Sequence, residues 1–115
     1  MKKLVLLLLV LFSLFSFAKK VNIVILETSD LHGRLFSYDY AIDQVDSSAG
    51  LTKAATIIKE ERAKNKNLIL ADNGDTVQDN NAELFNSMPV HPMIQGLNEL
   101  KYDFWTLGNH EFNFE

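Results

Sequence analysis

Three short apolar runs divide the chain, and each is followed by polar residues that can bind a metal ion. The runs cover residues 21–26, 67–71 and 104–107. Near-continuous apolar runs of about four to eight residues are typical of buried strands in a parallel sheet. Between the first two runs, apolar residues recur at helical spacing from Leu51 to Ile58, which predicts a helix over residues 50–64.

A second helix is predicted over residues 92–100, because Pro92 suits a first helical position and an apolar stripe follows it. Strand, helix and strand with a short return loop predict an α/β fold with parallel strands and a right-handed crossover. We expect Ser47 or Ser48 to cap the first helix. His91 is predicted to have a structural or capping role at the second helix rather than to bind a metal.

The stretch from 35 to 49 is polar and aromatic and is predicted to be an irregular loop near the mouth of a site. Its Tyr38 and Tyr40 could stack on a nucleobase or could pack as ordinary loop residues, and composition alone favours ordinary packing. A short helical turn is predicted over residues 82–86.

The first 18 residues are predicted to be a secretory signal peptide. Lys2 and Lys3 precede an almost wholly apolar segment, and Ser16 and Ala18 place small residues where a signal peptidase reads the chain. An uncleaved membrane anchor is the alternative, but the apolar run is shorter than the ~20 residues of a spanning helix. We therefore expect cleavage after Ala18, no stable membrane span in this segment, and export to the periplasm, the cell surface or the extracellular space.

Length, charge and cysteine content narrow the classes of function. The 115 residues correspond to about one domain. A net charge of -4 without a basic patch gives no electrostatic case for binding a nucleic acid polymer. The chain has no cysteine, which excludes thiolate metal ligands and disulfide bonds within it.

The first polar cluster contains Asp30 and His32, two positions apart. Alternate side chains of an extended segment point the same way, so both can reach one ion. Carboxylate oxygen with imidazole nitrogen suits Zn, Mn or Fe better than Ca or Mg. Taken alone, this pair fits a simple turn with a surface histidine equally well or better.

The second and third clusters follow the other two apolar runs. Asp75 comes after Gly74 and is the candidate carboxylate for bridging two cations, although a turn aspartate would look the same. Asp72 is predicted to be the turn residue of the two aspartates. Asn109 and His110 follow the third run and place a carboxamide and an imidazole at the expected end of a strand.

Together the three clusters carry a resemblance to a known family. Asp30-x-His32, Gly74-Asp75-x-x-Gln78 and Gly108-Asn109-His110-Glu111, in this order, resemble the calcineurin-like metallophosphoesterases, and more closely their secreted 5′-nucleotidase branch. Within that branch, segments 30–33, 38–40, 72–76 and 91–94 are most similar to the 2′,3′-cyclic-nucleotide 2′-phosphodiesterase/3′-nucleotidases.

The resemblance implies a role for each matching residue. Asp30 and His32 correspond to ligands of a first metal ion, Asp75 to the carboxylate that bridges both ions, and Asn109 to a ligand of the second ion. His110 corresponds to the catalytic histidine that steadies the phosphoryl oxygen or the leaving group. Two divalent ions are implied, of Zn, Mn, Fe or Co, whose identity the sequence does not fix.

The resemblance also implies the fold and the reaction. The chain would be the N-terminal part of a four-layer αββα sandwich, with residues 19–115 belonging to the catalytic domain. The expected activity is hydrolysis of 2′,3′-cyclic nucleotides and 3′-nucleotides, small-molecule substrates, by a metal-activated water. A 5′-nucleotidase or UDP-sugar hydrolase of the same branch is the near alternative. A non-catalytic secreted metal-binding protein is the alternative from another class.

The matched ligands are too few for two tight metal sites. The second ion would have only Asp75 and Asn109, and the family carries further histidine ligands and a base-stacking domain downstream. We therefore expect these 115 residues to be the N-terminal part of a longer enzyme and to be inactive alone. Asn113, where relatives usually show Asp or Asn, is at most a small departure, and Glu115 stands where Gly is common.

Overall fold

The structure is a computed structural model that describes residues 2–3, 5 and 18–114. The predicted signal peptide therefore lies largely outside the described residues. Within the part that is described, no helix is long and apolar enough to cross a membrane.

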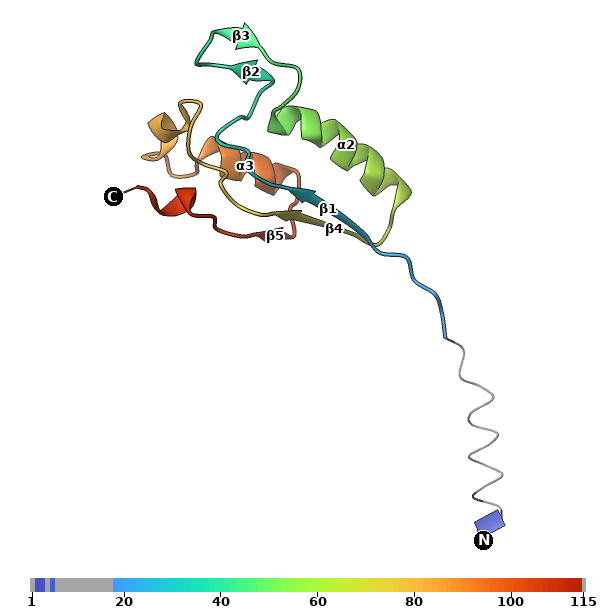
Figure 1. Cartoon of the computed structure of the whole chain (residues 1–115). Coiled ribbons are helices and arrows are strands. Elements are labelled where there is room, and N and C mark those ends of the chain that lie inside the picture. The colour runs from blue at the N-terminus through green and yellow to red at the C-terminus, as the bar shows by residue number, and fades with distance from the viewer. Residues whose placement is uncertain (1, 4, 6–17, 115) are drawn as a thin grey trace.

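A small parallel sheet forms the centre of the fold (Figure 1). Its strands lie in the order β1 (Val24–Thr28), β4 (Leu68–Asp72) and β5 (Phe104–Trp105). β1 and β4 pair in register from Val24 opposite Leu68 to Thr28 opposite Asp72, and β4 pairs with β5 through Ala71 and Asp72. The predicted α/β class with a parallel sheet is confirmed.

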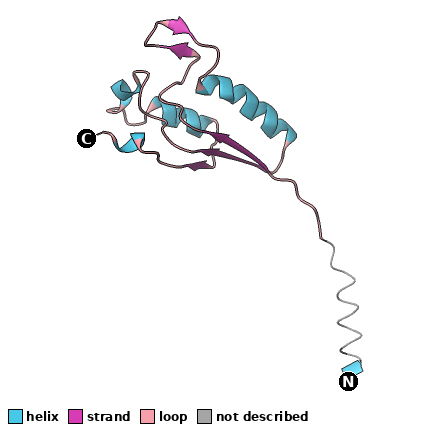
Figure 2. Cartoon of the chain, viewed as in Figure 1, coloured by secondary structure: helices cyan, strands magenta, loops and turns pink. Residues whose placement is uncertain are grey.

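Two helices connect these strands (Figure 2). Helix α2 (Leu51–Lys64) precedes β4, and helix α3 (Pro92–Glu99) precedes β5. A 3₁₀ turn, η1 (Ala82–Phe85), lies between β4 and α3, where a short helical turn was expected. The predicted apolar stripe of α2 is buried, and the core brings together Leu51, Ile58, Leu70, Val77, Met93, Leu97 and Leu100. Both helices therefore pack against the face of the sheet on which Leu70 lies.

The apolar run at residues 21–26 predicts a buried strand, as expected for a central strand covered on both faces, and this prediction is wrong for the described residues. β1 is an edge strand, and Ile25 is 68% exposed. The strand also starts later than predicted, because only residues from Val24 onward have partners in β4. Among the residues that the structure describes, the helices cover one face of the sheet, and Ile25 on the other face is exposed.

The third strand is also shorter and less buried than its apolar sequence indicates. It comprises Phe104 and Trp105 alone, and Phe104 is 63% exposed. Hydrogen bonding to β4 ends when the Thr106 N–H donates to the carbonyl of Asp72 at 2.9 Å. The chain then leaves the sheet toward the polar cluster at Asn109.

The stretch predicted as an irregular loop contains a hairpin, β2 (Tyr38–Asp39) and β3 (Gln44–Val45). Its turn forms because the Asp39 carboxylate accepts hydrogen bonds from the backbone N–H groups of Ala41 (2.9 Å) and Ile42 (3.3 Å). The rings of Tyr38 and Tyr40 pack edge to face, 5.0 Å apart.

Of the two predicted N-caps, the one on α3 is confirmed and the one on α2 is wrong. His91 caps α3, as predicted, because its Nδ1 accepts a hydrogen bond from the Met93 N–H at 3.2 Å. The prediction that Ser47 or Ser48 caps α2 is wrong, since Gly50 occupies that position without a side-chain bond. The Ser48 hydroxyl instead donates to Asp46 at 2.5 Å.

Candidate metal centre

The loops after β1 and β4 run side by side beyond the end of the sheet. The backbone N–H of Asp30 donates to the carbonyl of Gly74 at 3.0 Å, and that of His32 donates to the carbonyl of Asp75 at 2.9 Å. The N–H of Gly33 continues the series to Thr76 at 2.8 Å. These bonds fix the two ligand-bearing loops relative to each other.

Three of the predicted ligand or catalytic residues adopt a backbone conformation that ordinary side chains avoid. The φ angles are 54° for Asp30, 44° for His32 and 56° for Asp75. A left-handed conformation in a non-glycine residue costs of order 1–3 kcal/mol and persists only where the surroundings enforce it. The bonds between the two loops provide that enforcement, and such strain is typical of functional sites.

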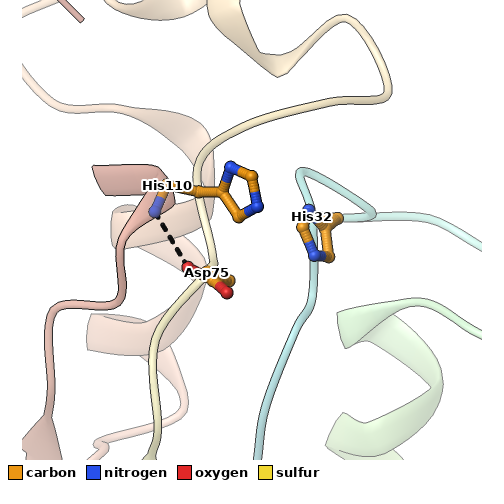
Figure 3. Close-up of side chains that lie close together, drawn as sticks. All are labelled: His32, Asp75 and His110. Carbon is orange, nitrogen blue, oxygen red and sulfur yellow. Dashed lines mark hydrogen bonds between the residues drawn. The ribbon is translucent and has the colours of Figure 1, made fainter. Parts of the chain in front are cut away.

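His32, Asp75 and His110 come together at this end of the sheet (Figure 3). Each offers one ligand atom, and these atoms lie within 4.8 Å of one another. The rings of His32 and His110 meet edge to face, with their centroids 5.1 Å apart. The backbone N–H of His110 donates a hydrogen bond to Oδ1 of Asp75 at 3.0 Å. Three residues from three separate loops thus form a group that can hold a metal ion.

Asp30 lies beside His32 but does not belong to this group of three. Oδ1 of Asp30 is 3.8 Å from Nε2 of His32, and the other carboxylate oxygen accepts a hydrogen bond from Ser29. Metal–ligand bonds of about 2.0–2.2 Å let two ligands of one ion stand up to roughly 4 Å apart, so Asp30 and His32 can share an ion. Asn109 is exposed and immediately precedes η2 (His110–Phe112).

Asp72 has the turn role that the sequence predicted, because its carboxylate accepts a hydrogen bond from the Gly74 N–H two residues on, and it also has a buried supporting role. It is the last residue of β4 and is fully buried. Its carboxylate accepts hydrogen bonds from the hydroxyls of Thr28 (2.6 Å) and Thr76 (2.7 Å) and from the Gly74 N–H (3.1 Å). Asp72 therefore supports the Asp75 loop from beneath.

Gly74 and Gly108 allow the second and third loops to touch. Gly74 has a φ of 97°, and a Cβ on it would overlap the backbone of Gly108. A Cβ on Gly108 would overlap the carboxylate of Asp75. Only residues without a side chain permit this approach.

Glu111 is the functional residue that sequence reasoning missed. Its Oε2 accepts hydrogen bonds from the backbone N–H groups of Asp75 (2.8 Å) and Gly108 (2.7 Å), while Oε1 accepts from Thr76 (2.5 Å) and Val77 (3.2 Å). Burial raises the pKa of Glu111, but these four donors together outweigh it and hold the pKa below its usual range. The only sequence signal was its place directly after the Asn-His pair.

His110 is oriented by the Gln78 carboxamide, which Asn113 supports in turn. Its Nδ1 lies in hydrogen-bond contact with Oε1 of Gln78 and 2.9 Å from Nδ2 of Asn113, which itself donates to Gln78 at 2.7 Å. Because the Gln78 oxygen can only accept, we assign the ring proton to Nδ1. Nε2 is then the ring atom available to a ligand.

An open cleft of about 520 Å³ adjoins the centre on the β1 side. Asp30 and His32 line it, and so do the cationic side chains of Arg34 and Lys53. Arg34 is paired with Asp46 at 2.5 Å. Carboxylate oxygens and imidazole nitrogens suit a divalent transition metal, and a cleft carrying cationic groups suits an anionic ligand.

Comparison with known proteins identifies the family. The sequence profile described as calcineurin-like phosphoesterase matches residues 23–115. The chain belongs to this family. Calcineurin-like phosphoesterases are hydrolases, so the family and the enzyme class are those that the sequence motifs predicted.

Relatives with assigned activities include nucleotide phosphoesterases. The chain is 38% identical over 109 residues to the trifunctional nucleotide phosphoesterase protein YfkN of Bacillus subtilis, covering 86% of this chain. It is 39% identical over 100 residues to the 2′,3′-cyclic-nucleotide 2′-phosphodiesterase/3′-nucleotidase of Haemophilus influenzae, covering 82% of this chain. A snake venom 5′-nucleotidase of Crotalus adamanteus is 34% identical over 99 residues, covering 84% of this chain.

The solved structure of calcineurin-like phosphoesterase YfkN from Bacillus subtilis resembles the fold, with a TM-score of 0.73 and 39% identity. The match covers 79% of this chain and 30% of that chain. This chain spans 8%, 15% and 16% of the three relatives named above.

Proposed function

We propose that the protein is an exported phosphoesterase that uses two divalent metal ions to hydrolyse 2′,3′-cyclic nucleotides and 3′-nucleotides. The observation that carries this proposal is the convergence of His32, Asp75 and His110 at the carboxyl ends of the strands. The naming of the Haemophilus influenzae relative supports the substrate class.

Asp30, His32 and Asp75 would hold one ion, and Asp75 and Asn109 would contribute to the second. The fit of the donors supports this: Asp30 and His32 lie 3.8 Å apart at their ligand atoms, and His32 and Asp75 belong to the group within 4.8 Å. When bound, such ions supply positive charge against the phosphate oxygens and make a water molecule acidic enough to attack near neutral pH.

The residues of the chain itself would orient the substrate and move one proton. His110, held at Nδ1 by Gln78, would direct Nε2 toward the leaving oxygen, and in its doubly protonated form Nε2–H would donate the proton that this oxygen takes up. Lys53 in the adjoining cleft would attract the phosphate anion. The hydrogen bonds of Glu111 hold the loop that carries His110 against the Asp75 loop.

Export follows in this proposal from the N-terminal basic and apolar pattern, with residues 1–18 removed and residues 19–115 retained in the catalytic domain. N-terminal sequencing of the native secreted product tests this part. A product that starts at Lys19 is the expected result, and a product that retains Met1 would contradict it.

Hydrolysis of 2′,3′-cyclic AMP by the native full-length product, of which these 115 residues are expected to be the N-terminal part, tests the activity. The protein is treated with a chelator, dialysed, and assayed before and after adding Mn²⁺ or Zn²⁺. We expect activity to disappear on chelation and to return with metal, and Asp75→Asn to abolish both metal uptake and hydrolysis. Asp43→Asn, an exposed aspartate in the β2–β3 hairpin, is the matched control.

A 5′-nucleotidase is the second candidate, because the Crotalus adamanteus relative has that name. Turnover of 5′-AMP without turnover of 2′,3′-cyclic AMP would select it. Metal uptake without hydrolysis of either compound would select a non-catalytic metal-binding protein. Wild-type hydrolysis by Asp75→Asn would show that the site is assigned to the wrong residues.

A further inference from the structure

Asp79 lies against the ring of His32 on the side away from Asp30. Its Oδ2 is 3.0 Å from Nδ1 of His32, whereas Nε2 of the same ring faces Asp30. Nδ1 is buried and, within the described part of the chain, makes no well-aligned hydrogen bond. A buried ring nitrogen without a partner is costly, and a small rotation of the Asp79 carboxylate supplies one.

The segment that carries Asp79 also holds the backbone of His32. The side-chain amide of Asn80 donates to the His32 carbonyl at 2.8 Å. The carbonyl of Asp79 lies against Gly33, at a position where any Cβ on Gly33 would overlap it. The Asp79–Asn80 segment therefore contacts His32 at its ring and its carbonyl, and contacts the next residue at its backbone.

Asp79 has a φ of 72°, a conformation that glycine adopts freely and aspartate only at a cost. Glycine at position 79 would adopt this conformation without strain, yet the chain has an aspartate there. Asp79 does not belong to the group formed by His32, Asp75 and His110, and it approaches the ring nitrogen opposite the one near Asp30. Asp79 is therefore placed to contact a metal ligand rather than to be one.

We propose that Asp79 positions His32: its carboxylate accepts a hydrogen bond from Nδ1–H of the ring, so that the lone pair of Nε2 is directed at the metal ion. Histidines that bind metals commonly donate their other N–H to a carboxylate, which fixes both the tautomer and the ring orientation. The inference rests on the proposed metal-dependent function, and it assigns to Asp79 a role in metal affinity without direct contact with the metal.

Two substitutions separate this role from a role in folding. Asp79→Gly removes the carboxylate and relieves the backbone, while Asp79→Asn keeps a neutral acceptor of similar shape. Asp43→Gly is the matched control, because Asp43 also has a positive φ, 54°, and lies in the hairpin turn. The readouts are Mn²⁺ affinity from free Mn²⁺ measured by electron paramagnetic resonance, the unfolding midpoint of the metal-free protein, and the His32 tautomer from ¹⁵N NMR at alkaline pH.

We expect Asp79→Gly to weaken Mn²⁺ binding about 10–100-fold, the usual cost of losing such a partner. Asp79→Asn should weaken binding less, and Asp43→Gly should leave it unchanged. The unfolding midpoint of Asp79→Gly should equal or exceed that of the wild type, and the population of the Nδ1–H tautomer should fall.

Wild-type Mn²⁺ affinity and an unchanged tautomer in both Asp79 variants would overturn the role of Asp79. A lowered unfolding midpoint with unchanged affinity would also overturn it, since that result indicates a purely structural residue. A wild-type protein that binds no Mn²⁺ would overturn the proposed function itself. If Asp79→Gly does not fold, Asp79→Asn carries the test alone.

Discussion

The carboxylate of Glu111 accepts a hydrogen bond from the backbone N–H of Asp75 at 2.8 Å, joining positions 36 residues apart. The same carboxylate binds the N–H groups of Thr76, Val77 and Gly108. One side chain thus fastens the loop of the proposed bridging carboxylate to the loop that carries Asn109 and His110. The relative placement of those two loops depends on Glu111.

Glu111→Gln should weaken the metal centre and the fold together. The glutamine NH₂ group must face one of the two pairs of backbone donors, so two of the four bonds are lost. We expect the free energy of unfolding to fall by about 1–3 kcal/mol, and metal affinity to fall about tenfold or more. Urea unfolding and Mn²⁺ titration measure the two effects. Glu60→Gln, at an exposed position on α2, is the control and should change neither.

Gly108→Ala should displace Asp75. The added Cβ would overlap the Asp75 carboxylate, whose Oδ1 also accepts the His110 N–H. Since a misplacement of about 1 Å can cost roughly 100-fold in rate, we expect kcat to fall at least tenfold at saturating metal. Gly96→Ala in α3 is the control, because its Cβ meets only the movable ends of apolar side chains. Equal activity in both variants would contradict the packing argument.

Asp72→Ala should be strongly destabilising. The side chain is fully buried and accepts hydrogen bonds from Thr28, Thr76 and the Gly74 N–H. Its removal leaves these donors without their acceptor, and we expect a loss of about 2–4 kcal/mol in the free energy of unfolding. Glu60→Ala, an exposed position on α2, should stay within about 0.5 kcal/mol of the wild type. Chemical denaturation of both variants compares them directly.

Tyr102 should make the folded state less stable as the pH rises into the alkaline range. Burial raises the pKa of the Tyr102 phenol, whose hydroxyl lies 3.0 Å from that of Thr28. The folded state therefore favours the neutral phenol. The contribution of the Tyr102 phenol to the free energy of unfolding is fully present below the unfolded-state pKa of about 10. It is lost as the pH rises from there through the folded-state pKa.

Tyr102→Phe should remove this part of the pH dependence. Unfolding measured between about pH 9 and pH 11 should show a smaller loss of stability for Tyr102→Phe than for the wild type, because phenylalanine cannot ionise. Tyr40→Phe, at an exposed position in the hairpin, should retain the full loss. Parallel pH profiles for the wild type and Tyr102→Phe would contradict the burial argument.

The sequence by itself determined the α/β class, the two helices with their buried stripes, and the three loops in which functional residues lie. These features depend on spacing between near neighbours, which is visible in the order of residues. Motif spacing also identified Asp75 and His110, which the fold brings together with His32. The extent of β1 and β5, and which face of each strand meets solvent, depended on pairing and on which helices cover the sheet.

Only the tertiary structure decided which polar residues support the centre and which form it. Asp72 was predicted to be a turn residue, and only the structure shows that it is also buried beneath the Asp75 loop. The roles of Glu111 and Asp79 were not visible in the sequence, because Glu111 binds the Asp75 loop and Asp79 contacts His32, and both partners are distant in sequence. The direction of a side chain at a loop junction is set by the contacts between loops. Those contacts exist only once the strands have paired and brought the loops to one end of the sheet.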